Sequence, residues 1–184
     1  MSNTVYLVRH AEAESNTDPF FVGEASLTAQ GVFQSKQLAE KFNNETIMHI
    51  YTSSIIRAKL TASEISRVTK ASITELPLLK ERKGSYSTDR VFVPEESFVD
   101  LQKRVKEIKL FLQNHSEGRL VVVSHAIFIK NLLADIMTGE CGDESIITKI
   151  VDTLVIDNAT ISKIVFNKEK GKWRIMYSNC VEKF

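Results

Sequence analysis

Two short apolar runs in the sequence end in the same way, with a histidine followed by an alanine. Residues 5–8 lead into Arg9-His10-Ala11, and residues 120–123 lead into Ser124-His125-Ala126. Runs this short, rich in β-branched residues and with little polar alternation, are typical of strands buried on both faces. Such strands occur in sheets that helices cover on both sides. This feature therefore predicts an α/β fold.

Helical and strand patterns alternate along most of the chain and then give way to strands. Helical spacing of apolar residues recurs in segments 28–42, 56–68, 98–113 and 126–137, with Thr28 and the hydroxyls of residues 52–54 as capping groups for the first two. Strand patterns lie at 5–8, 47–51, 72–76, 120–123, 151–156, 160–166 and 173–177, the last two joined by a polar hairpin loop. We expect a three-layer sandwich: a mostly parallel central sheet with an antiparallel edge strand and helices on both faces. With no internal linker or repeat, residues 1–184 are expected to form a single domain.

One internal segment fits neither pattern. Residues 77–94 are mixed and polar, with little periodicity. Long irregular segments inside compact domains are usually functional, so this one is predicted to be a lid or specificity loop.

Charge and composition exclude several classes of partner. The 24 basic and 23 acidic side chains leave a formal net charge of +1, so bulk charge attracts neither nucleic acid nor anionic membranes. No apolar stretch approaches the roughly 20 residues of a membrane span, and the N-terminus lacks a signal-peptide pattern, so we expect a cytoplasmic protein. Cys141 and Cys180 lie far apart without metal-ligand spacing, which argues against a disulfide framework or a structural zinc site. No other cluster of metal-ligating residues is visible in the sequence, so we expect no metal cofactor.

Polar side chains follow three of the predicted strands. The first strand ends in Arg9-His10, Arg57 lies near the start of the helix after the second, and the strand at 120–123 ends in Ser124-His125. In open α/β sheets, ligands bind outside the carboxyl ends of the strands. We therefore expect these side chains to meet in one local site.

The residue types at these positions suit a phosphate dianion. Two arginines offer planar forks to phosphate oxygens, and the helix starts near Ser54 and Ala126 add N–H groups and positive dipole ends. A neutral imidazole in such a pocket can attack phosphorus and become phosphohistidine, while a nearby acid protonates the leaving oxygen. Arginine and the second histidine would stabilise charge on the equatorial oxygens.

The segments that carry these residues resemble the histidine phosphatase superfamily, also called phosphoglycerate mutase-like, over nearly the whole chain. They are Leu7 to Asn16, Leu27-Thr28 with Gly31, Tyr51 to Ala58 with Thr61-Ala62, and Val123 to Ala126. The resemblance implies the phosphoglycerate mutase-like fold, with His10 as the phosphorylated nucleophile. It also implies that Arg9, Arg57 and His125 hold the phosphoryl group, and that Asn16 contacts it or the leaving group. The family commonly has glycine after the nucleophile, where this chain has Ala11.

The proton donor is the less regular part of the pattern. The family usually places a glutamate in a Leu-x-Glu context shortly before a glycine, and Leu79-Lys80-Glu81 with Gly84 resembles it with one residue fewer. Glu81 is the expected donor. The alternatives are Glu12, Glu14 and Glu24.

The resemblance leaves three functions open. The first is a phosphatase that hydrolyses a small phosphomonoester through phosphohistidine. The second is a phosphoglycerate mutase, disfavoured by the short chain because mutases of the family usually carry extra segments. The third is a regulatory protein that acts on phosphohistidine or phosphoserine of a partner. Neither the physiological substrate nor the oligomeric state follows from the sequence.

Overall fold

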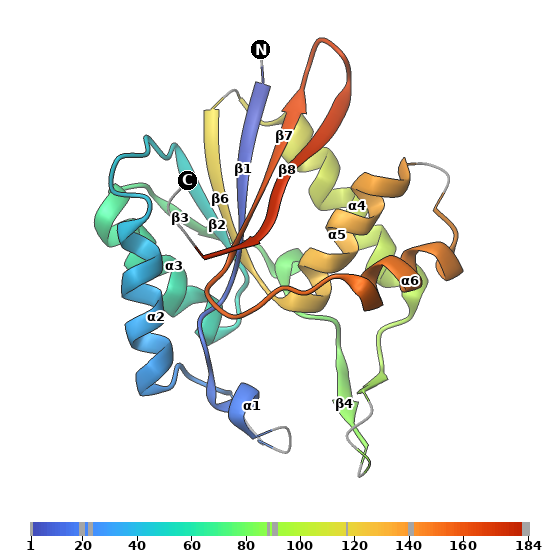
Figure 1. Ribbon diagram of the computed structural model, residues 1–184, viewed down its shortest axis with the longest axis horizontal. Helices are drawn as coiled ribbons and strands as arrows, with labels where there is room; N and C mark the ends of the chain where they lie inside the picture. Colours follow the sequence, from blue (N-terminus) through green and yellow to red (C-terminus); the bar gives the residue numbers. More distant parts are fainter. Residues whose placement is uncertain are drawn as a thin grey trace.

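A six-stranded mixed sheet lies at the centre of the computed structural model, with helices on both faces (Figure 1). The structure describes residues 2–18, 21, 24–87, 89, 92–116, 118–139 and 142–181. The strands are β1 (Ser2–Arg9), β2 (His49–Thr52), β3 (Ile73–Glu75), β6 (Gly118–Ser124), β7 (Ile161–Asn167) and β8 (Lys172–Cys180), in the order β3-β2-β6-β1-β7-β8. The first four of that order pair in parallel, while β7 is antiparallel to β1 and β8 to β7. The predicted fold class is confirmed.

Two separate apolar cores flank the sheet. Along β1, Val5 and Leu7 join the core under α4 (Phe98–Asn114) and α5 (Ala126–Thr138), while Tyr6 and Val8 join the core under α2 (Ala29–Glu40) and α3 (Ile56–Thr69). The strand β6 alternates in the same way. This is why both predicted strands read as continuous apolar runs rather than alternating ones.

The caps of the two helices on the second face differ from each other. Thr28 caps α2 as expected, because its Oγ1 accepts a hydrogen bond from the N–H of Gly31 at 2.9 Å. The expected hydroxyl cap of α3 is wrong: the N-cap is Ile55, which has no capping side chain. Ser53 Oγ instead accepts from the N–H of Ile55 itself, at 3.2 Å.

The predicted strand at 151–156 is also wrong. Residues up to 153 form the end of α6 (Glu144–Thr153), whose N-cap Asp143 accepts a hydrogen bond from the N–H of Ile146 at 2.9 Å. Ile147 is buried on the inner face of this helix, and Ile156 enters the core only after the helix has ended. The β-branched residues therefore belong to a capped helix and its exit, not to a strand.

Segment 77–94 is more regular than predicted. It contains a 3₁₀ turn, η1 (Pro77–Leu79), and an antiparallel hairpin of β4 (Gly84–Tyr86) and β5 (Phe92–Pro94); residues 88, 90 and 91 lie outside the described part. In Figure 1 this hairpin and the short helix α1 (Glu14–Thr17) extend beyond the same end of the sheet, on opposite sides. They flank the end at which β1 and β6 finish.

Two further expectations concern cysteine pairing and membranes. Cys141 lies outside the described residues, so the expectation for the two cysteines stays a prediction. Within the described ranges, no helix has both the length and the apolar character needed to cross a bilayer.

Candidate active site

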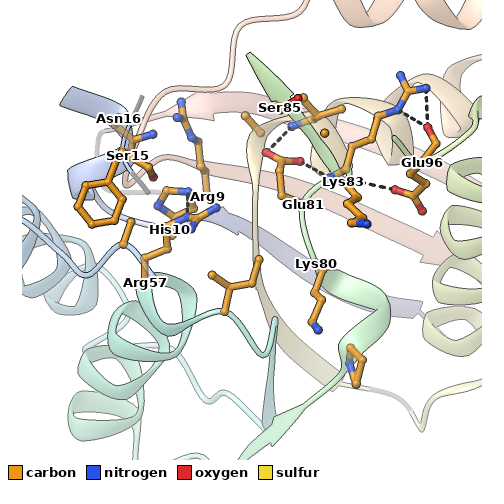
Figure 2. Close-up of a pocket in the computed structure, with 18 of the residues that line it drawn as sticks. Arg9, His10, Ser15, Asn16, Arg57, Lys80, Glu81, Lys83, Ser85 and Glu96 are labelled. Atoms are coloured by element: carbon orange, nitrogen blue, oxygen red, sulfur yellow. Dashed lines mark hydrogen bonds between the residues drawn. The ribbon is translucent and has the colours of Figure 1, made fainter. Parts of the chain in front are cut away.

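The carboxyl ends of β1, β2 and β6 lie side by side and bring the predicted side chains together. A cavity of about 1010 Å³ opens at this edge of the sheet. Six of the seven predicted site residues line it: Arg9, His10, Asn16, Arg57, Glu81 and Ala126. Figure 2 labels the first five of these. The seventh, His125, lies directly behind His10, with the two ring centroids 5.0 Å apart.

His10 is held in one tautomer. Its Nδ1 lies 2.7 Å from the carbonyl oxygen of Ala11, which can only accept, so Nδ1 carries the proton. Its Nε2 accepts a hydrogen bond from Nε of Arg57 at 3.1 Å. Burial, reinforced by the charge of Arg57, lowers the pKa of His10 to about 3. The imidazole is therefore neutral, with its Nε2 lone pair on the side of Arg57.

The loop after His10 is fixed by its neighbours. Ala11 is fully buried, and its N–H donates to Oγ1 of Thr61 at 3.1 Å. The carbonyl of His10 accepts from the N–H of Ala159 at 3.2 Å. Alanine in place of the family's usual glycine thus fits without exposing the backbone.

Arg9 and Arg57 reach the cavity from different elements. Arg9 ends β1, and its Nη1 donates to the carbonyl of Ile156 at 2.7 Å. Arg57 lies in the first turn of α3, where its Nε contacts His10. Two guanidinium groups therefore face one buried imidazole, an arrangement that favours an anion between them.

His125 is fully buried and forms the N-cap position of α5. Its Nε2 lies 2.9 Å from Oγ of Ser53, while its Nδ1 has no hydrogen-bond partner among the described residues. Burial, with the nearby charge of Arg57 and Arg9, lowers the pKa of His125 well below its ordinary value. A buried ring nitrogen without a partner beside His10 is a polar group that a bound ligand can satisfy.

Glu81 approaches the same cavity from the loop after η1. Its carboxylate accepts hydrogen bonds from the N–H groups of Arg82 at 3.0 Å, Phe128 at 3.1 Å and Ile127 at 3.3 Å. Burial raises the pKa of Glu81 above its ordinary value, although these three donors and Arg57 act in the opposite direction. The carboxyl group thus retains a proton to higher pH than an exposed glutamate does.

The alternative carboxylates are used elsewhere. Oε1 of Glu12 accepts from the hydroxyl of Thr28 at 2.7 Å, and Oε2 of Glu14 accepts from the N–H of Ser26 at 2.9 Å. Glu24 is exposed. Glu96 does line the cavity, but its bidentate hydrogen bonds with Arg104 lower its pKa and keep it ionised.

Sequence reasoning missed Arg104, and it named Ser124 without foreseeing that this side chain holds the Glu81 loop. Arg104 on α4 binds both oxygens of Glu96 at 2.7 Å and donates to the carbonyls of Leu78 at 2.6 Å and Lys80 at 3.0 Å. Ser124 Oγ donates to the carbonyl of Leu79 at 2.7 Å. The contacts with the carbonyls of Leu78, Lys80 and Leu79 join segments far apart in the chain, so no local sequence pattern predicts them.

Asn158 is a second residue that the sequence analysis missed. Its Nδ2 donates to the carbonyl of His10 and to Oδ1 of Asn16, both at 3.1 Å. Oδ1 of Asn16 also accepts from the N–H of Ala13 at 2.9 Å. The two bonds fix the orientation of the Asn16 amide, and no acceptor for its NH₂ group is found among the described residues.

No group of three or more His, Cys, Asp or Glu side chains within the described ranges is arranged to hold a metal ion. The fold and the cationic cavity define the class: an α/β protein with an anion-binding site at the carboxyl edge of its sheet.

Comparison with known proteins identifies the family. The model of the "Histidine phosphatase superfamily (branch 1)" matches residues 5–90 and 83–180. The chain belongs to the histidine phosphatase superfamily.

Relatives carry both phosphatase and mutase names. The chain is 31% identical over 159 residues to a "Probable phosphatase" of Schizosaccharomyces pombe, in a match that covers 73% of this chain but only 56% of that protein. It is 30% identical over 161 residues to "Probable phosphoglycerate mutase GpmB" of Proteus mirabilis, covering 72% of this chain and 74% of the relative. The solved structure of YhfR from Bacillus stearothermophilus is similar with a TM-score of 0.83 and 20% identity, covering 98% of each chain, which supports the fold.

Proposed function

We propose that this protein is a metal-independent phosphatase that hydrolyses a small phosphomonoester through a phosphohistidine on His10. The observation that carries the proposal is the state of His10. Its imidazole is neutral, its hydrogen bond to the carbonyl of Ala11 keeps the proton on Nδ1, and its Nε2 lone pair lies beside Arg57 in the cavity. That is the protonation state a nitrogen nucleophile needs.

The first half-reaction uses the residues around His10. Phosphate oxygens are better acceptors for the Arg57 fork than a neutral imidazole is, so substrate binding frees Nε2 to approach phosphorus. Arg9, Arg57, the NH₂ of Asn16, the N–H of Ala126 and the buried Nδ1 of His125 would hold the phosphoryl oxygens. As the Nε2–P bond forms and the P–O bond breaks, Glu81 gives its proton to the leaving oxygen.

In the second half-reaction a water attacks the phosphohistidine. The Glu81 carboxylate takes a proton from that water, the P–N bond breaks, and inorganic phosphate leaves. The three backbone donors around Glu81 stabilise the carboxylate in the interval between the two steps. His10 is then free again, and Glu81 is protonated for the next turnover.

Release of inorganic phosphate tests the proposal. Purified protein should liberate phosphate from a panel of sugar phosphates, nucleotides and phospho-amino acids, and His10→Ala should lower the rate by more than about 10³-fold. A strong chelator should leave the rate unchanged. Phosphate release that persists in His10→Ala would contradict the mechanism.

A phosphoglycerate mutase is the second candidate, because a relative at 30% identity carries that name. Conversion of 3-phosphoglycerate to 2-phosphoglycerate in the presence of 2,3-bisphosphoglycerate separates the two. We expect hydrolysis to exceed isomerisation.

The cytoplasmic location remains a proposal that cell fractionation would test.

A further inference from the structure

The cavity carries more positive charge than a phosphoryl group needs. Its lining includes six cationic side chains and two carboxylates: Arg9, Arg57, Lys80, Arg82, Lys83 and Arg104, against Glu81 and Glu96. A phosphomonoester brings about two negative charges at neutral pH. The excess of cations therefore points to a ligand with more than one anionic group, provided that some of these cations are available.

Most of the cations distant from His10 already have protein partners. Arg104 forms the bidentate pair with Glu96, and Arg82 donates to the carbonyl of Glu96 at 3.1 and 3.2 Å. Nζ of Lys83 lies 2.7 Å from a carboxylate oxygen of Glu95. These three side chains hold the loop together, and their donor groups are already engaged by protein acceptors.

Lys80 differs from them. It makes no ion pair or side-chain hydrogen bond with any residue that the structure describes, and its side chain is exposed. Its backbone is fixed at both ends, because its N–H donates to the carbonyl of Pro77 at 3.2 Å and its carbonyl accepts from Arg104 at 3.0 Å. In Figure 2 its side chain extends away from Glu81 and Glu96. It is thus an available ammonium group on a rigid base at the wall of the cavity.

We propose that Lys80 binds a second anionic group of the substrate, a carboxylate or a second phosphate. The substrate class is then a small phosphomonoester whose leaving group is itself negatively charged. This inference rests on the proposed function. The volume of about 1010 Å³ agrees with it, since small-molecule sites of roughly 300–1,000 Å³ accept whole metabolites rather than a phosphate alone.

Binding to a protein that cannot turn over tests the proposal separately from catalysis. His10→Ala would be titrated calorimetrically with 3-phosphoglycerate, with propane-1,3-diyl bisphosphate and with glycerol 3-phosphate, which lacks the second anion. We expect at least about fivefold tighter binding of the two ligands with a second anion. Adding Lys80→Met should reduce that preference to less than about twofold. The ligand that loses more affinity identifies the second group as carboxylate or phosphate.

The matched control is Lys106→Met, which removes the same charge from an exposed position on α4 outside the cavity lining. It should leave the preference intact. Equal binding of all three ligands, a preference that survives Lys80→Met, or the same loss in both variants would overturn the inference. Turnover by the wild-type protein is measured independently, so a failure of the phosphatase proposal would be recognised as such.

Discussion

At the scale of single residues, burial determines the protonation of the groups around His10. His10 is 2% exposed, and His125 is fully buried. An imidazolium at either position would be without hydration and close to the charges of Arg9 and Arg57, so the pKa of both histidines is lowered. Burial acts on Glu81 in the opposite sense and raises its pKa, because the charged form of a carboxyl group is the anion. The same burial thus favours the neutral form of both groups, the uncharged imidazole of His10 and the protonated carboxyl of Glu81.

A protonated Glu81 can act as the proton donor, and the variant Glu81→Gln tests this role. The variant should lower kcat/KM for glycerol 3-phosphate by about 10²-fold or more but kcat/KM for p-nitrophenyl phosphate by less than about tenfold. This parameter reports phosphoryl transfer to His10, a step in which only the poor leaving group needs a proton. In the wild type, kcat/KM for glycerol 3-phosphate should fall as pH rises through the raised pKa of Glu81.

Glu24→Gln is the matched control, because Glu24 is exposed and does not line the cavity. It should change neither rate appreciably. Equal slowing of both substrates by Glu81→Gln would move the donor role to another residue.

The residues that could be predicted are those that follow a recognisable strand or family motif. Arg9, His10 and His125 follow apolar runs at or within one residue of their ends, Arg57 follows the hydroxyl residues 52–54, and the structure brings the four together. Asn158 could not be found in this way. Its contact with His10 spans 148 positions of sequence and depends on how β7 pairs with β1.

At the scale of elements, the start of α2 supports the loop after His10. A Cβ on Gly31 would lie 1.9 Å from the carbonyl oxygen of Glu12. That same carbonyl accepts a hydrogen bond from the N–H of Thr28 at 3.2 Å. The helix therefore packs directly against backbone two residues from His10, and only glycine leaves room for it.

The variant Gly31→Ala should have two opposing effects on stability, a gain in helix propensity and a clash with the backbone of Glu12. Propensity alone would stabilise the protein by about 1 kcal/mol, whereas overpacking against backbone costs about 1–3 kcal/mol. We expect a net loss of about 1 kcal/mol in urea unfolding, together with a lower kcat because the loop after His10 must shift.

Gln30→Ala, at an exposed position of the same helix, should alter neither quantity by much. A Gly31→Ala protein as stable and as active as wild type would show that the close approach is unimportant.

The elements that sequence predicted well are those in which local pattern and burial agree. β1 and β6 are apolar because both of their faces are covered. At 151–156 the two signals separate: the β-branched composition favours a strand, but Asp143 caps a helix that runs through residue 153. The hairpin in 77–94 was missed because its strands are only three residues each, too short for a period to be read.

At the scale of the whole molecule, the buried histidines link stability to pH. In the unfolded chain a histidine binds a proton below about pH 6.5, whereas folded His10 does so only near pH 3. Between these values the unfolded state binds more protons, so the free energy of unfolding falls as pH falls. The contribution is fully present above pH 6.5.

Denaturant unfolding at pH 7 and pH 5 measures this linkage. His10 alone should account for a loss of about 2 kcal/mol over that interval. His10→Asn should lose correspondingly less stability on acidification than wild type does. Identical losses for the two proteins would contradict the assignment of His10 as a buried neutral imidazole.

If residues 1–184 form the single domain we propose, each unfolding curve should show one transition.

The central claim is that His10 carries the phosphoryl group, and trapping that adduct tests it most directly. Protein would be mixed briefly with a ³²P-labelled phosphomonoester and quenched in base, where phosphohistidine survives, before peptide mapping. We expect label on the peptide that contains His10 in wild type, more of it in Glu81→Gln with a good leaving group, and none in His10→Ala. Label that persists in His10→Ala, or that maps to another residue, would contradict the account.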